Sequence, residues 1–311
     1  MTDFKYVFGP VPSRRLGRSL GVDLIPFKTC SYDCLYCQLG HTTNKTAERS
    51  SYLPTEKIIR DVEKKIQQGV QADYITLSGS GEPTLHADCG RIIRRIKEIT
   101  NIPVAVLTNG SLLSDPEVRR DLIMADLVVP SLDAGDPQMF AAVNQPDPSI
   151  DFDGVIQGLI DFRREYKGQV WLEVFILKGL TDSDDQIAKI ADIIRQAKPH
   201  KVQLNTVARP PANAKAQAVT RDELERLARQ FGVIAEIAAD FTGVHAQPDS
   251  KVRREDILNL LSRRPCTLED ISASLGLHPN ESLKHLNHLL EDGRIRTDQV
   301  GAARFYMLSG D

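Results

Sequence analysis

The stretch SLGVDLIPFKTCSYDCLYCQLG, residues 19–40, joins a short apolar segment to three closely spaced cysteines. Residues 19–27 are rich in Val, Leu and Ile and are short for a helix, so they predict a β-strand. Cys30, Cys34 and Cys37 follow directly, four and three positions apart. The chain therefore places three thiols at the carboxyl end of its first predicted strand.

Short apolar segments recur along the chain and alternate with longer amphipathic ones. Further strands are predicted at 72–80, 102–110, 125–133, 170–177 and 201–207. Between them, apolar residues recur every three or four positions, which predicts helices at 55–69, 88–99, 115–124, 152–166 and 183–197. Strand–helix alternation of this kind indicates a parallel sheet with helical crossovers.

Polar motifs stand at the ends of these strands: GSGEPT after the second, TNG after the third and SLDA after the fourth. A parallel barrel gathers such residues over one mouth, where its active site lies. Six strands are too few to close an eight-stranded barrel. The sequence therefore predicts an α/β fold, a partial (βα)6 TIM-like barrel of parallel strands.

The pattern changes near residue 252. Three short helices are predicted at 252–264, 267–276 and 280–293, followed by a hairpin at 294–308. Thr267 and Asp270 have the spacing of a capping box. Three helices and a hairpin are typical of a small winged helix-turn-helix domain. The predicted organisation is a barrel domain at 1–245, a linker at 246–251 and a winged-helix domain at 252–311.

Composition and the pattern of apolar residues indicate the cellular compartment. No apolar run approaches the length of a bilayer span, and the opening MTDFKYVFGP has no basic segment leading into an apolar one. We expect a cytoplasmic protein without a membrane segment. Five cysteines, an odd number, do not suggest a disulfide framework, and in a reducing compartment they indicate metal or redox chemistry.

The cysteine triplet admits several interpretations. A structural zinc site normally takes four protein ligands, often as two separated pairs. A disulfide would leave one thiol over. A [4Fe–4S] cluster held by three thiolates, with its fourth iron open, fits the triplet directly. The alternative is a zinc site completed by a histidine.

Four motifs in order resemble those of the radical S-adenosylmethionine (radical SAM) superfamily, over roughly residues 8–210. They are the Cys-x3-Cys-x2-Cys triplet, SGEP at 80–83, SLDA at 131–134 and LEVFILKGLTDSDD at 172–185. Ser80 departs from the family pattern, which has Gly-Gly-Glu-Pro there. The flanking arginine segments resemble a branch of uncharacterised Fe–S oxidoreductases related to wyosine-type tRNA-modifying enzymes.

The resemblance implies two cofactors, a [4Fe–4S] cluster on Cys30, Cys34 and Cys37, and S-adenosyl-L-methionine (SAM) on its open iron. The residues it implies for SAM are Tyr36, Ser80, Gly81, Glu82, Pro83, Asn109, Ser131, Asp133 and Ile176. Asn205 joins them because a buried amide needs partners that a ligand can supply. The implied reaction is reductive cleavage of SAM to methionine and a 5′-deoxyadenosyl radical that abstracts hydrogen from a substrate.

The substrate and product are not named by the sequence. Arginine forks suit carboxylate or phosphate groups, so Arg14, Arg15, Arg18 and Arg209 suggest an anionic substrate. The resemblance to the tRNA-modifying branch implies an RNA-related one. The alternative is that these are ordinary surface arginines. The catalytic residues beyond the cluster are unknown, and the electron donor is expected to be a flavodoxin or a ferredoxin-type protein.

Two other functions compete. One is a glycyl-radical-type activase that acts on a partner protein. The other is a non-catalytic Fe–S sensor that binds DNA through the winged helix. Residues 251–311 hold nine basic and nine acidic residues, without the basic balance of a duplex-binding module. Contact with a protein or peptide, or packing over the open side of the barrel, is therefore favoured over nucleic acid for this domain.

Overall fold

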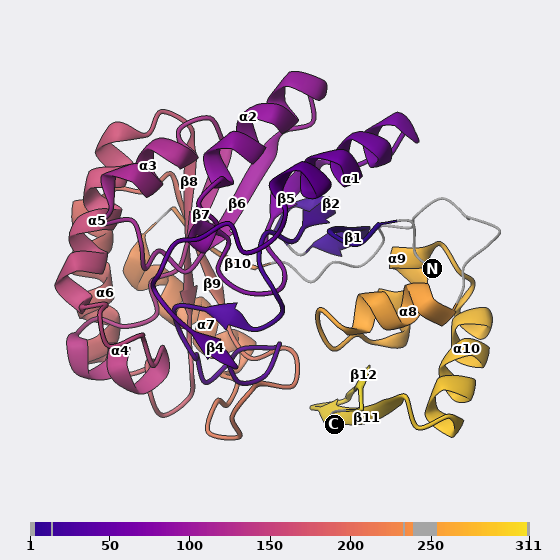
Figure 1. Cartoon of the computed structure of the whole chain (residues 1–311). Helices are drawn as coiled ribbons and strands as arrows, with labels where there is room; N and C mark the ends of the chain where they lie inside the picture. Colours follow the sequence, from indigo (N-terminus) through magenta and orange to yellow (C-terminus); the bar gives the residue numbers. More distant parts are fainter. Residues whose placement is uncertain (1–3, 14, 233, 239–253, 310–311) are drawn as a thin grey trace.

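The computed structural model describes residues 4–13, 15–232, 234–238 and 254–309. An eight-stranded sheet forms its body, in the order β1-β2-β5-β6-β7-β8-β9-β10. Six strands are those predicted: β2 (Gly17–Val22), β5 (Tyr74–Leu77), β6 (Val104–Thr108), β7 (Leu127–Pro130), β8 (Gln169–Phe175) and β9 (Lys201–Asn205). From β2 to β10 (Ala235–Ile237) all neighbours are parallel. The described end strands do not pair, so the sheet is a partial barrel (Figure 1).

The sheet differs from the prediction at its edges. β1 (Val7–Ser13), which runs antiparallel to β2, was not predicted, and its sequence contains a glycine and two prolines. An edge strand tolerates proline because one side of its ladder lacks a partner. The first predicted strand, 19–27, ends earlier, at Val22. β10 was not predicted, because three residues carry little periodic signal.

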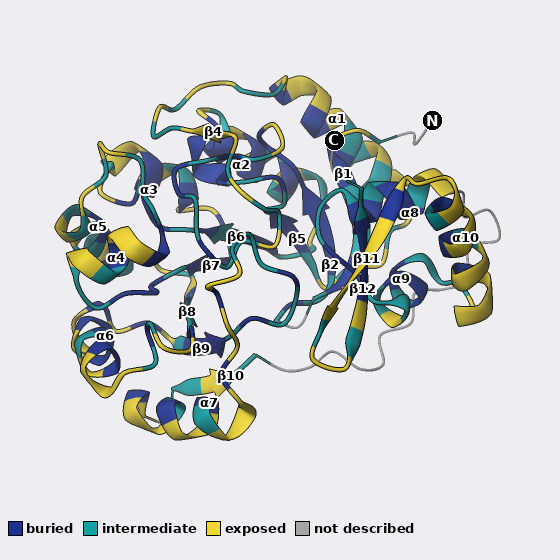
Figure 2. Ribbon diagram, turned by 90° about the horizontal axis from the view of Figure 1, so that it is seen from below, coloured by how far each residue is buried: buried dark blue, intermediate teal, exposed yellow. Residues whose placement is uncertain are grey.

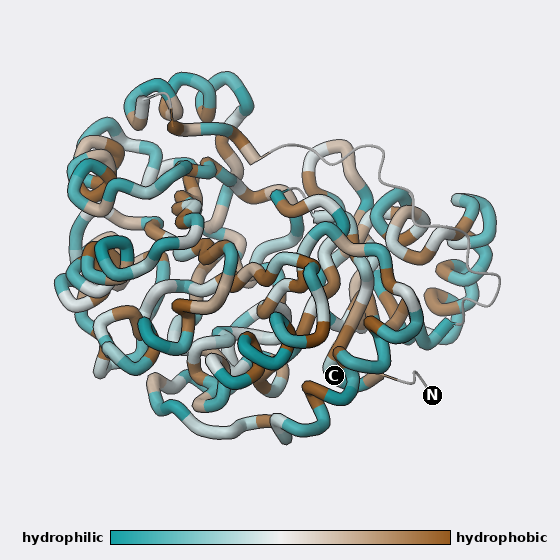
Figure 3. The backbone as a smooth tube through the Cα atoms, turned by 90° about the horizontal axis from the view of Figure 1, so that it is seen from above, coloured by the Kyte–Doolittle hydropathy of each residue, from teal (hydrophilic) through white to brown (hydrophobic). Residues whose placement is uncertain are grey.

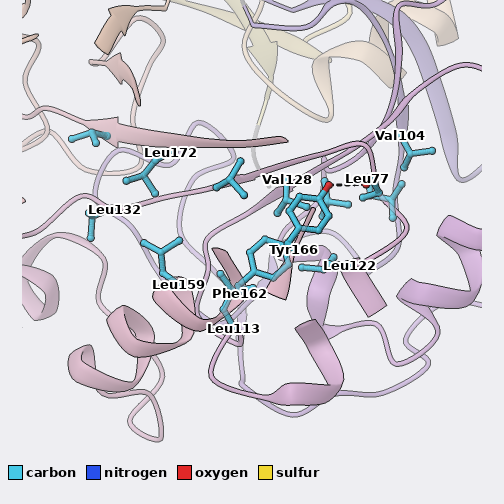
Figure 4. Packing of buried hydrophobic residues seen from close by; sticks show 14 of the residues in the cluster. Leu77, Val104, Leu113, Leu122, Val128, Leu132, Leu159, Phe162, Tyr166 and Leu172 are labelled. Atoms are coloured by element: carbon cyan, nitrogen blue, oxygen red, sulfur yellow. Dashed lines mark hydrogen bonds between the residues drawn. The ribbon is translucent and has the colours of Figure 1, made fainter. Parts of the chain in front are cut away.

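The five predicted barrel helices are all present: α1 (Thr55–Gln67), α2 (Cys89–Ile99), α3 (Pro116–Leu122), α5 (Phe152–Glu165) and α6 (Asp184–Ala197). Two short ones were not predicted, α4 (Pro137–Val143) and α7 (Arg221–Ala228). Helices pack on the outer face of the sheet. In the core that results, the rings of Phe162 and Tyr166 stack 4.8 Å apart beside Leu122 and Val128 (Figure 4).

The other face of the sheet lines the barrel interior. Side chains of a strand alternate between faces, and β8 shows this clearly. Val170, Leu172 and Val174 are fully buried against the helices. Trp171 belongs to a separate cluster inside the barrel, and Glu173 shares its side of the strand. Figures 2 and 3 show the same layering, with a buried apolar sheet and exposed polar outer helix surfaces.

Residues 254–309, here called the C-terminal domain, contain the predicted three helices and hairpin. These are α8 (Arg254–Leu261), α9 (Leu268–Leu275), α10 (Pro279–Glu291), β11 (Ile295–Val300) and β12 (Ala303–Leu308). The Thr267–Asp270 capping box is present. The winged-helix assignment and the domain boundaries stay predictions, and the predicted linker 246–251 lies outside the described residues.

The C-terminal domain lies beside β1 (Figure 1). Val11 of β1 belongs to the hydrophobic cluster of that domain, and Phe8 packs against it. Among the helices that the structure describes, none has both the length and the apolar character needed to cross a bilayer.

Candidate functional site

The three cysteines lie at the mouth of the partial barrel. Cys30 ends the short strand β3 (Thr29–Cys30), which pairs with β4 (Asn44–Lys45), and Cys34 and Cys37 lie in the loop that follows. All three have free thiols. The Leu35 N–H donates to the Val143 carbonyl at 3.0 Å, which ties this loop to the end of α4.

Two asparagines direct amide groups at the cysteine sulfurs. The Asn109 Nδ2 atom lies 3.6 Å from Cys30 Sγ, and the Asn144 Nδ2 atom lies 3.5 Å from Cys34 Sγ. Burial raises the pKa of all three thiols, in the case of Cys30 to about 12. A thiol must lose its proton to bind iron. Thiolates here therefore require a compensating positive charge, which a bound metal centre would supply.

The donor set is compatible with an iron–sulfur cluster. The described residues contain no group of three His, Cys, Asp or Glu placed around one metal position. In a mononuclear zinc site all sulfurs converge on one ion. In a cubane each thiolate binds a different iron, so the sulfurs stand further apart. Three free thiols on one loop, with amide donors beside two of the sulfurs, supply the three ligands that such a cluster needs.

The SGEP motif forms a tight turn against the strand that carries Cys30. Gly81 bridges Thr29, and a Cβ atom on Gly81 would lie 1.8 Å from the Thr29 carbonyl oxygen. Only glycine therefore fits at position 81. The Glu82 N–H donates to the same oxygen at 3.2 Å, and Pro83 begins the short 3₁₀ helix η1 (Pro83–Leu85).

The Glu82 carboxylate is completely enclosed and accepts four hydrogen bonds. Oε1 accepts from the Thr84 N–H at 3.0 Å, the Thr84 hydroxyl at 2.6 Å and the Thr108 hydroxyl at 2.7 Å. Oε2 accepts from the Asn109 N–H at 2.7 Å. Burial raises the pKa of Glu82, and these donors oppose the rise. Glu82 thus joins the ends of β5 and β6.

Asp133, from the SLDA motif, connects the cysteine loop to β8. Its carboxylate accepts from the Tyr36 hydroxyl, from Asn144 Nδ2 at 2.8 Å and from the Phe175 N–H at 3.1 Å. The Tyr36 and Phe175 rings stack 3.9 Å apart. Burial raises the pKa of Asp133 to about 6, against the hydrogen bonds from Tyr36 and Asn144. The group is therefore mostly ionised at neutral pH.

A second polar group lies at the ends of β7, β8 and β9. Glu173 pairs with Arg15, and its Oε1 accepts from Asn205 Nδ2 at 3.0 Å. Ser131 bridges Glu173 through its backbone. Asn205 therefore has a protein partner for its amide nitrogen, and Ile176 is fully buried in the main core. The SAM-binding roles predicted for Ser131, Asn205 and Ile176 stay predictions.

The arginines predicted to bind substrate are scattered. Arg14 lies outside the described residues. Arg18 pairs with Asp73 on the outer surface. Arg209 donates to Asp270 Oδ2 and to the Pro265 carbonyl oxygen, both at 3.1 Å. The structure thus gives Arg18 and Arg209 internal partners, and a substrate role for the four arginines stays a prediction.

Two residues of the site were missed by sequence reasoning. Asn144 follows a short helix and belongs to no recognised motif, so the sequence gives no signal for it. Asp23 is 5% exposed and accepts from the Ser80 N–H at 3.0 Å and from the Ser80 hydroxyl at 2.8 Å. The sequence did point to Asp23, because a carboxylate inside an apolar strand segment needs a buried partner.

Comparison with known proteins agrees with this site. A model of the Radical SAM superfamily matches residues 24–191. Over 307 residues the chain is 34% identical to a UPF0026 protein of Methanocaldococcus jannaschii, covering 96% of this chain and 95% of that one. Over 308 residues it is 43% identical to a protein named GTPase Obg from Brachyspira hyodysenteriae. That match covers 98% of this chain but 45% of the relative, so the chain spans about half its length.

Solved structures show the same fold. A radical SAM methyltransferase from Sphaerobacter thermophilus superposes with a TM-score of 0.52 at 18% identity, covering 70% of this chain and 66% of that one. Native anSMEcpe with bound AdoMet gives a TM-score of 0.52 at 14% identity, covering 68% and 58%. At these identities the likeness concerns the fold alone. Together with the sequence match over more than half its length, it shows that this chain belongs to the radical SAM superfamily.

Proposed function

We propose that this protein is an enzyme that holds a [4Fe–4S] cluster on Cys30, Cys34 and Cys37 and cleaves SAM reductively. The observation that carries the proposal is the donor set at the barrel mouth. Three free thiols share one loop, and amide nitrogens lie beside two of their sulfurs. Hydrogen bonds to ligand sulfurs are one means by which proteins set cluster potentials.

When bound, the reduced cluster would supply the electron for cleavage of SAM into methionine and a 5′-deoxyadenosyl radical. This radical would be able to abstract hydrogen from the substrate. The chain's own residues hold these groups and keep water away. Cys30, Cys34 and Cys37 bind as thiolates, and Asn109 and Asn144 donate to sulfur. The α4 contact fixes the loop that carries them.

The surrounding residues are proposed to bind SAM. The 80–83 turn presents backbone groups beside the cysteine loop, since Gly81 contacts the strand that ends at Cys30. Asp133 and Ser131 are proposed to bind the ribose. Asp133 is mostly ionised at neutral pH, so it can accept hydrogen bonds from hydroxyl groups. Ile176 is proposed to lie against the adenine.

The substrate is proposed to be anionic or RNA-related, on the strength of the arginine-rich segments alone. Arg15 pairs with Glu173, which also accepts from Asn205, a residue proposed to bind SAM. The electron is proposed to come from a flavodoxin or a ferredoxin-type protein. A protein or peptide is the proposed external contact of the C-terminal domain.

The proposal is tested by anaerobic reconstitution with iron and sulfide, followed by reduction with dithionite in the presence of SAM. The expected product is 5′-deoxyadenosine, measured by chromatography, together with about four irons and four sulfides per chain, as a cubane requires. Cys34→Ala is the control, and it should form neither an intact cluster nor deoxyadenosine.

Two outcomes contradict the proposal. One zinc per chain, with no iron–sulfur absorption after reconstitution, would favour the mononuclear site. A cluster that forms without any deoxyadenosine, while duplex DNA binding changes with the cluster state, would favour the sensor function.

A further inference from the structure

The C-terminal domain reaches the SGEP turn through one buried carboxylate. Asp23 lies just after β2, and its Oδ1 atom accepts both the N–H and the hydroxyl of Ser80. Its Oδ2 atom accepts from Arg263 of the C-terminal domain, from Nε at 3.1 Å and from Nη2 at 2.8 Å. One carboxylate oxygen of Asp23 therefore binds the turn, and the other binds the C-terminal domain.

Arg263 is held in place from several sides. Its guanidinium lies over the Phe8 ring of β1, 4.5 Å from the ring centre. Its Nη1 atom donates to the Asn259 carbonyl oxygen at 2.7 Å. The side chains of Arg263 and Asp23 are 11% and 6% exposed. Solvent therefore screens this ion pair weakly.

The residues of the turn fit this arrangement. Gly79 has φ +124°, and a Cβ atom there would lie 2.3 Å from Asp23 Oδ1. Position 79 therefore lets the carboxylate approach the backbone. Ser80 stands where the related motif has glycine, and its hydroxyl is used on Asp23. The departure from the family pattern thus has a local structural reason in this chain.

Removing Arg263 would change what Asp23 can do. Burial raises the pKa of Asp23, and Arg263 opposes the rise. Without the guanidinium, the carboxylate must either stay charged without its cation or take up a proton. A protonated acid is a weaker acceptor, so the hold on Ser80 would loosen.

We propose that Arg263 and Asp23 are positioning residues for SAM, and that docking of the C-terminal domain fixes the backbone of the 80–83 turn. The inference rests on the proposed function, because it takes this turn to be part of the SAM site. Neither residue is proposed to contact the cluster or SAM directly. They act by holding Ser80.

Arg209 provides a matched control at the same interface. Its side chain is also 11% exposed, and it pairs across the two parts of the chain with Asp270. Its contacts do not include Asp23 or Ser80. A variant at position 209 therefore weakens docking in general but leaves the connection to the turn intact. Because SAM affinity is measured without substrate, the substrate role predicted for Arg209 does not affect the comparison.

The test measures SAM affinity of the reconstituted, unreduced full chain by calorimetry, with iron content and thermal unfolding recorded alongside. Arg263→Leu should raise the Kd for SAM about tenfold, by loss of a charged hydrogen-bonded pair, and Arg263→Lys should recover part of this. Arg209→Leu should raise the Kd less than about twofold, although its unfolding temperature falls by a similar amount. Iron content should match the wild type in all three variants.

Equal Kd changes in the Arg263 and Arg209 variants, or none in either, would overturn the inference while leaving the proposed function standing. A wild-type protein that carries the cluster but binds no SAM would overturn both. If Arg263→Leu fails to fold, the Kd of Arg263→Lys for SAM is compared with that of Arg209→Leu instead. It keeps the charge but not both hydrogen bonds, so an expected rise of about threefold distinguishes it from Arg209→Leu.

Discussion

Glu82 shows how one residue sets local geometry. It is 2% exposed and accepts four hydrogen bonds that join the ends of β5 and β6. Glu82→Gln replaces one acceptor oxygen with an NH2 group that faces existing donors. We expect the free energy of unfolding to fall by about 2–3 kcal/mol, since buried donors lose their partner. Urea denaturation measures the change.

Glu63→Gln is the control for this prediction. Glu63 also binds through two close contacts, to Arg95 Nε at 3.0 Å and Nη2 at 2.6 Å, but it is partly exposed on α1. Exposed pairs contribute less than about 1 kcal/mol. Similar losses for both variants would show that the buried hydrogen bonds of Glu82 stabilise the fold no more than an exposed ion pair does.

At the same scale, the sequence locates residues through their strand positions. Parallel strands bring their carboxyl ends to one edge of the sheet, and this brings together the cysteines, Glu82, Asn109 and Asp133. The order of strands and helices along the sequence is enough to predict it. Asn144 could not be found in this way. Its place depends on where a short helix ends in three dimensions, which no local pattern encodes.

At the scale of elements, α4 supports the cysteine loop. Asp136 caps this helix by accepting from the Met139 N–H at 2.9 Å, and it also binds Gln186 and Lys189. These contacts, the backbone one foremost, lower the pKa of Asp136 to about 2. The helix escaped prediction because seven residues give two turns of periodicity, too few to separate from a loop.

The Asp136 charge should stabilise the fold in a pH-dependent way. The folded pKa lies below the unfolded value, so the contribution is complete above about pH 4 and is lost as the pH falls toward 2. Asp136→Asn keeps the capping oxygen but removes the charge. We expect it to cost about 0.5–1 kcal/mol at pH 7 and progressively less between pH 4 and 3. Urea unfolding at several pH values measures this, and a constant difference would contradict it.

At the scale of the whole molecule, the barrel and the C-terminal domain share a hydrophobic cluster. Val11 of β1 is 9% exposed and lies with Ile257, Leu260, Ile271 and other residues of that domain. The strand–helix pattern and the change near residue 252 predicted both parts separately. The sequence left packing of this domain on the barrel as one alternative, but it did not locate the contact, because the contact involves β1, a strand that was not predicted.

Val11→Asp tests whether the two parts unfold as one unit. A carboxylate at this position has no partner among the apolar side chains of the cluster, so docking should weaken by roughly 2–3 kcal/mol. Hydrogen exchange, followed by mass spectrometry, should then speed up in α8, α9 and β12. Amides of α2 and α6, whose buried residues belong to the main core cluster and not to the one shared with the C-terminal domain, should keep their protection and serve as the internal control. Faster exchange in all of these elements would instead mean that the domain contact stabilises the whole fold, and unchanged exchange would mean that Val11 contributes little to docking.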